Sequence, residues 1–222
     1  MLFTPRHFSA THWSRDNTVH PTGNFCVEGL YTRPDRLKTI NFLEETYNAV
    51  SAKQAQQRSV EEQKGYLHYL RILEFNIRQT LFSNVANGSD TNTQLVSELF
   101  TLAVLVYLGR ATSDLLPELL DKTEQHIEKA FALFQTLECC DRQFPLFMLG
   151  CEARSEEHRA VYLDLVSRTQ HRSQAAPLVQ VETLVKASWA QSDLANHTGV
   201  KFDYIEKLNA LISSCKVIPT FV

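Results

Sequence analysis

The sequence has few of the features that enzymes use for chemistry. Its seven glycines are scattered over 222 residues, and no two of them form a Gly-x-Gly step, so a glycine-rich phosphate loop is absent. The patterns His-Glu-x-x-His and Gly-x-Ser-x-Gly do not occur either. Because no acid–base pair or activated nucleophile can be assembled from the spacing, we predict that the chain is not an enzyme.

Cysteine is also scarce, with five residues in the chain and no Cys-x2-Cys step. This excludes a secreted disulfide framework and a standard zinc half-site, and it favours a reducing compartment. The nearest approach to a metal constellation is Cys151, Glu152 and His158. Ser155 is predicted to begin a new helix between them, which favours a buried cysteine beside surface polar residues. We expect no cofactor and no metal in this chain.

Neither an excess of basic charge nor a long apolar run is present. There are 22 basic and 25 acidic residues, a net charge of −3, and the isoelectric point is about 6.2. A domain that binds DNA by itself usually has a basic face, so direct DNA binding is not expected. The most apolar stretch, Leu99 to Gly109, has about half of the ~20 residues that span a bilayer. It predicts a buried core helix, and no membrane partner is expected.

What the sequence does contain is helical periodicity. Apolar residues recur at steps of three and four from Pro34 onward, and no convincing alternation typical of strands appears. The pattern predicts an all-α fold of about seven or eight helices that pack as antiparallel neighbours, with no sheet. Ser59 and Glu62 form a predicted capping box, and Ser155 is a predicted N-cap. Residues 1–33 are predicted to be an irregular lead-in to a helical domain over 34–222.

Three segments, in order, carry a resemblance to a known family. The run Leu99–Leu108 is similar to the Leu-Ala-x-Leu-Ile-Tyr-Leu helix of the fungal-specific transcription factor domain. The run Phe144–Ala153 resembles that family's most recognisable stretch, Trp-Pro-Leu-Phe, two apolar residues and Gly-Cys-Glu-Ala, with phenylalanine in place of tryptophan. The run Val185–Leu194 looks like its Val-Trp-x-Gln-x-Asp-Leu helix. The segment from Tyr204 to Pro219 resembles the family's closing segment.

The resemblance implies a nuclear regulator of RNA polymerase II transcription. Members of the family carry an N-terminal binuclear zinc cluster that binds DNA, and this sequence has no six-cysteine cluster. The chain is therefore expected to be the C-terminal part of a longer family domain, which reaches DNA and zinc only through a missing N-terminal region. Its expected partners are a small-molecule effector or a transcription co-regulator protein. The alternative is a stand-alone helical interaction module derived from such a factor.

The resemblance also singles out a set of motif residues, and two roles are open for them. They either hold the helices together or line an effector pocket, and their small and apolar character favours packing. Glu152 and Arg159 are expected to pair with each other, or else Arg159 bonds carbonyl groups at a helix end. The motif residues are Pro145, Phe147, Gly150, Cys151, Glu152, Ala153, Arg159 and Trp189.

Overall fold

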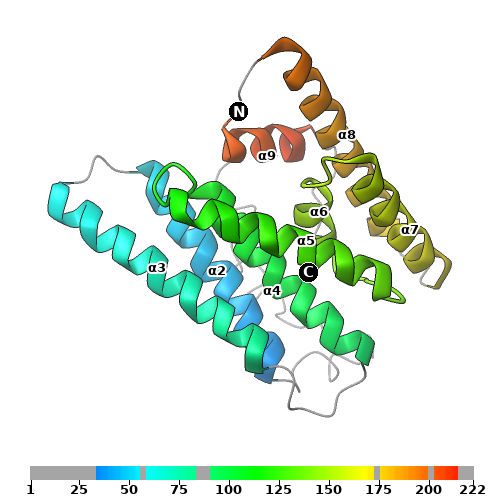
Figure 1. Cartoon of the computed structure of the whole chain (residues 1–222), viewed down its shortest axis with the longest axis horizontal. Coiled ribbons are helices and arrows are strands. Elements are labelled where there is room, and N and C mark those ends of the chain that lie inside the picture. Colours follow the sequence, from blue (N-terminus) through cyan, green and yellow to red (C-terminus); the bar gives the residue numbers. More distant parts are fainter. Residues whose placement is uncertain (1–33, 56–58, 84–90, 173–175, 200–202, 215–222) are drawn as a thin grey trace, which may run out of the picture.

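The computed structural model describes residues 34–55, 59–83, 91–172, 176–199 and 203–214. This part of the chain contains eight α-helices and one short 3₁₀ helix, and no strand occurs in it. The all-α prediction is therefore confirmed (Figure 1). The predicted lead-in, residues 1–33, lies outside the described residues. The helices are α2 (Pro34–Ala55), α3 (Val60–Ser83), α4 (Thr91–Ala111), η4 (Pro117–Leu119), α5 (Leu120–Thr136), α6 (Gln143–Gly150), α7 (Glu156–Arg172), α8 (Ala176–Thr198) and α9 (Tyr204–Ser213).

Helix α4 occupies the centre of the fold. It contacts α2, α3, α5, α6 and α9, and the segment from Leu99 to Gly109 is buried except for Phe100, which is partly buried. A helix that is apolar nearly all round has to be enclosed by others, so the predicted core helix is confirmed. In the described part of the chain, α4 alone is long and apolar enough to cross a membrane, by length and composition only. The other helices enclose it and account for its composition.

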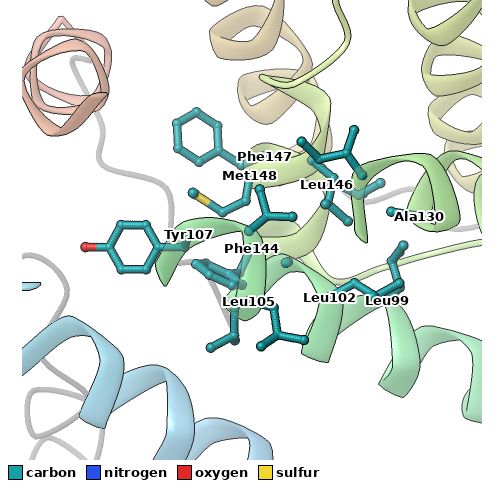
Figure 2. Packing of buried hydrophobic residues seen from close by; sticks show 14 of the residues in the cluster. Leu99, Leu102, Leu105, Tyr107, Ala130, Phe144, Leu146, Phe147 and Met148 are labelled. Carbon is teal, nitrogen blue, oxygen red and sulfur yellow. The ribbon is translucent and has the colours of Figure 1, made fainter. Parts of the chain in front are cut away.

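The short helix α6 lies against α4, and all eight of its residues are buried. Figure 2 shows Phe144, Leu146, Phe147 and Met148 among side chains of α4 and α5. The rings of Phe100 and Phe144 lie 5.2 Å apart between their centroids. Each fully buried large apolar side chain contributes about 1.5–3 kcal/mol relative to exposure, so this short helix is a large source of stability.

Helix ends and connections are satisfied by side chains. The Ser59 amide donates to Glu62 at 2.8 Å and the Glu62 amide donates to the Ser59 hydroxyl at 3.4 Å, which confirms the capping box. The Ser155 hydroxyl accepts from the amide of His158 at 3.1 Å, as predicted for an N-cap. At the end of α5, the carbonyl groups of Phe134 and Leu137 accept hydrogen bonds from Arg168 of α7. These bonds satisfy carbonyl groups where α5 ends and the irregular connection to α6 begins.

Two glycines within helices form a matched pair for a stability test. A Cβ at Gly109 would overlap the hydroxyl of Thr123 on α5, whereas a Cβ at Gly65 would meet nothing within 4 Å. We expect Gly109→Ala to lower the free energy of unfolding by about 1–3 kcal/mol through overpacking. Gly65→Ala is expected to raise it by about 0.5–1 kcal/mol through helix propensity. Urea denaturation measures both values.

A double variant separates overpacking from other effects of the first change. Thr123→Ala removes the hydroxyl that the new methyl group would overlap. Thr123→Ala should therefore lower the free energy of unfolding less in the Gly109→Ala background than in the unmodified protein. The difference between the two values is a favourable coupling energy. Equal effects of the two glycine substitutions would contradict the close approach of α4 and α5.

Candidate functional site

The family-motif residues gather where α6 ends and the chain turns through residues 151–155 into α7. We call this region, together with the face of α8 that covers it, the motif junction. Pro145 lies in the first turn of α6, where the missing amide hydrogen costs nothing. Phe147 is fully buried beneath the turn, and Ala153 is 2% exposed. The turn therefore packs against buried apolar side chains.

Gly150 and Trp189 connect α6 to α8. The indole N–H of Trp189 donates to the carbonyl oxygen of Gly150 at 2.8 Å, a buried hydrogen bond. A Cβ at Gly150 would lie 2.6 Å from the Tyr162 ring on α7 and 3.0 Å from Val185 on α8. The Tyr162 and Trp189 rings meet edge to face at 5.7 Å. Glycine is required here by the close approach of two neighbouring helices.

Cys151 follows Gly150 and is a free, partly buried thiol packed against the apolar core. Burial raises the pKa of its thiol to about 12, and the nearby Ser188 hydroxyl and Lys207 charge oppose that rise only in part. A thiol with so high a pKa is almost entirely protonated at neutral pH, and the thiolate is the form that attacks electrophiles and binds metals. The structure thus gives Cys151 the properties of a packing residue.

Glu152 is a buried carboxylate and is paired with Arg110 at the end of α4. Its side chain is 6% exposed, and its Oε2 lies 2.9 Å from the Arg110 guanidinium. Arg110 also bonds Glu124 on α5 at 2.8 Å, and Arg154 reaches both carboxylates. Burial works against the charge on Arg110, but the two carboxylates outweigh it and raise the pKa of Arg110. This network joins α4, α5 and the turn after α6.

Arg159 does not pair with Glu152, so that expectation was wrong. Its guanidinium lies 2.6 Å from Asp193 on α8 and 3.0 Å from Glu156. It also lies 5.4 Å from the centre of the Trp189 ring, and its Nε donates to the Ala153 carbonyl at 3.5 Å. Ala153 lies in the connection between α6 and α7, so this bond is not the alternative that was expected, one to a carbonyl at a helix end. The direction of α7 places Arg159 toward α8 and away from Glu152.

The three residues considered for a metal site have separate partners. His158 stacks on the ring of Phe131 with centroids 4.0 Å apart, and its Nε2 lies 3.5 Å from Glu128. Glu152 faces Arg110, and Cys151 faces α8. Among the described residues, no group of three or more His, Cys, Asp or Glu side chains is placed to hold a metal ion. The structure does not bring this constellation together.

Several residues of the motif junction were not found from the sequence. Arg110 contacts Glu152, and Glu124 contacts Arg110. Tyr162 lies against Gly150, and Asp193 contacts Arg159. Asp193 belongs to the family-like run Val185–Leu194 but is not one of the motif residues, and the other three lie outside the family-like runs. One signal for Arg110 was available, since it is a single charge at the end of a long apolar run and needs a counter-charge. In chemical terms the junction joins five helices, α4 to α8, through one buried ion pair, one buried hydrogen bond and close aromatic packing.

Comparisons with known proteins agree with the resemblance seen in the motifs. A family model described as the fungal specific transcription factor domain matches residues 36–213. The curated "Transcription factor iacI" of Pestalotiopsis fici is 35% identical over 162 residues, which are 73% of this chain and 40% of that protein. The chain thus spans less than half of that relative's length. No solved structure matches the chain significantly.

The two carboxylates that bond Arg110 give a matched test of burial. The Arg110 side chain is 11% exposed, and Glu152→Gln leaves it with Glu124 as its remaining carboxylate partner. We expect a loss of about 3 kcal/mol in the free energy of unfolding, the lower end of the cost of breaking a buried pair. Glu124→Gln, at a side chain 46% exposed, is expected to cost less than about 1 kcal/mol. Denaturant titration of both variants checks this, and equal losses would contradict the buried pair.

Proposed function

The chain belongs to the family of fungal specific transcription factor domains, and we propose that it is the regulatory domain of a longer zinc-cluster transcription factor. In this proposal a small-molecule effector or a co-regulator protein acts on the helical domain. The zinc cluster that binds DNA lies outside this chain. The factor acts in the nucleus on genes that RNA polymerase II transcribes.

The observation that carries the proposal is the family match over residues 36–213. It covers all but the first two residues of the described helices, and it includes the motif junction. The curated relative, a transcription factor by name, is longer than this chain, which leaves room for a DNA-binding region elsewhere in that protein. The net charge of −3 also favours a role beside DNA-binding elements over a role in holding DNA directly.

The motif junction suggests how such a domain transmits a signal. Helices α2 and α3 lie on one side of α4, and α7 and α8 lie on the other side of the fold (Figure 1). Two helices lie between: α6 contacts α4 and α8, and α5 contacts α4 and α7. A ligand shifts a conformational equilibrium only by its difference in affinity for the two states. We place that difference at the junction, where the Arg159–Asp193 contact joins α7 to α8 and would break if α8 shifted. The Arg110–Glu152 pair joins α4 to the turn after α6 and would break if α6 moved relative to α4. The proposed role requires no catalysis by any side chain.

A second candidate function is a stand-alone interaction module that competes for partners of a related factor. The observation in its favour is an exposed apolar stripe on α3, formed by Tyr69, Ile72 and Phe75. The same stripe is also expected of a regulatory domain that docks a partner, so it does not distinguish the two functions. Only an assay that joins the chain to DNA separates the two functions.

A reporter assay tests the regulatory role. The full chain is fused to an unrelated sequence-specific DNA-binding domain in a fungal cell, upstream of an RNA polymerase II promoter with measurable basal activity. We expect transcription to change severalfold, up or down, relative to the DNA-binding domain alone, because the chain recruits or excludes transcription proteins. The Glu152→Gln variant, which weakens the motif junction, should reduce the change.

Two controls make the outcome decisive. Occupancy of the reporter by the fused protein is measured by chromatin immunoprecipitation, and the unfused chain serves as the matched control. Full occupancy with unchanged transcription would contradict the regulatory role. A change in transcription caused equally by the unfused chain would favour the stand-alone module.

A further inference from the structure

Helix α3 has two apolar faces, and the fold uses only one of them. Leu70, Leu73 and Ile77 are at most 1% exposed and form part of the apolar core. On the outer side, Tyr69, Ile72 and Phe75 are 38%, 45% and 49% exposed. Their spacing of three residues places them along one side of the helix. We call these three residues the outer α3 face.

No other described helix has a comparable row of exposed apolar side chains. Among the described residues, the remaining exposed large hydrophobics are single residues or lie apart, such as Val60, Leu120, Val179 and Leu194. Single exposed apolar residues are ordinary, whereas a contiguous row is typical of a docking surface. Figure 1 shows α3 at the margin of the bundle, where its outer side is not covered by another described helix.

Basic side chains line the edge of this face toward α5. Four cations lie there, with side-chain exposures of 53% for Arg71, 35% for Arg78, 42% for Lys122 and 51% for Lys129. Their carboxylate partners are Glu118, Glu74 and Glu98, at 47%, 8% and 24%. The cations are therefore more exposed than most of the acids that balance them, and the surface presents positive charge.

Three of these cations also lie close enough to His126 on α5 to act on its charge. Burial lowers its pKa to about 4, and the charges of Arg78, Lys129 and Lys122 lower it further. These three cations thus act together on a single point beside α3. The Arg78 guanidinium also lies 5.8 Å from the centre of the Phe75 ring, which joins the basic edge to the apolar row.

The opposite edge has different chemistry. There the Tyr69 hydroxyl donates to Glu45 of α2 at 3.1 Å. The outer α3 face therefore has a basic edge toward α5 and an acidic residue toward α2. This asymmetry favours a ligand that carries its own negative charge along one side only.

We propose that the outer α3 face docks an amphipathic helix of another protein, with apolar residues at i, i+3 or i+4, and i+7 and carboxylates along one edge. The apolar row of the partner packs against the inclined row of Tyr69, Ile72 and Phe75 on α3, and its carboxylates meet the cations of α3 and α5. The proposal specifies the chemistry of a partner protein for the regulatory domain. It rests on the proposed regulatory role for its biological setting and not for the binding. The binding itself is measured without any transcription assay, so the two proposals fail independently.

Fluorescence anisotropy tests the proposal with a designed helical peptide of about 20 residues, long enough to populate a helix. It carries leucine on one face and glutamate along one edge, and a control peptide carries lysine at the same positions. The full chain is expected to bind the acidic peptide at least about tenfold more tightly than the basic one. Added salt should weaken the binding of the acidic peptide.

Variants locate the site. Ile72→Asp should weaken binding of the acidic peptide at least about tenfold, and Lys122→Glu combined with Lys129→Glu should remove its advantage over the basic peptide. Val179→Asp, at an exposed apolar residue of α8, is the matched control and should leave binding unchanged. Circular dichroism confirms that all variants remain folded.

Three results would overturn the proposal. One is equal affinity for the two peptides, and another is binding that Ile72→Asp does not weaken. The third comes from sedimentation equilibrium of the full chain without peptide. A dimer that Ile72→Asp dissociates would assign the outer α3 face to a second copy of this chain instead of a partner helix.

Discussion

The fold depends on how one short helix is held from both sides. Helix α6 is buried along its whole length, so the polar groups at its ends must find partners within the protein. The carbonyl of Gly150 at its C-terminal end accepts the indole N–H of Trp189, and α4 packs against its other side. The same carbonyl also accepts the Ala153 amide at 3.2 Å, so the group that depends on this contact is the indole N–H. A buried N–H left without a partner costs about 1–3 kcal/mol, so this hydrogen bond fixes α8 against α6. The close contacts of Gly150 with α7 and α8 follow from the same arrangement.

This constraint bears directly on regulation. Helix α6 contacts both α4 and α8, while α5 contacts α7 directly. The Arg110–Glu152 pair lies on the α4 side of α6 and the Arg159–Asp193 pair on the α8 side. Packed interiors have discrete arrangements and do not deform continuously, so a small change at such a point produces a defined shift elsewhere. The proposed regulatory role uses the motif junction as that point. The outer α3 face lies on the far side of α4, where a partner can act without disturbing α6.

Much of the helical framework followed from the sequence because local rules determine it. Periodicity predicted the all-α class and the central position of α4, and short-range capping rules located the starts of α3 and α7. The pairing of charges could not be predicted in the same way. Arg110 and Glu152 are 42 residues apart in sequence, and only the direction of each helix decides which charges meet. Of the two alternatives expected for Arg159, the pair with Glu152 was wrong for that reason.

Hydrogen exchange of the native protein tests most directly whether α6 is held as described. Buried amides that open only through global unfolding have the highest protection in a protein. We predict that the amides from Phe147 to Cys151 reach the full free energy of unfolding, together with those of α4. We also predict that amides on the exposed side of α3 exchange at lower free energies. Exchange of the α6 amides at free energies below those of α3 would contradict the central place given to α6.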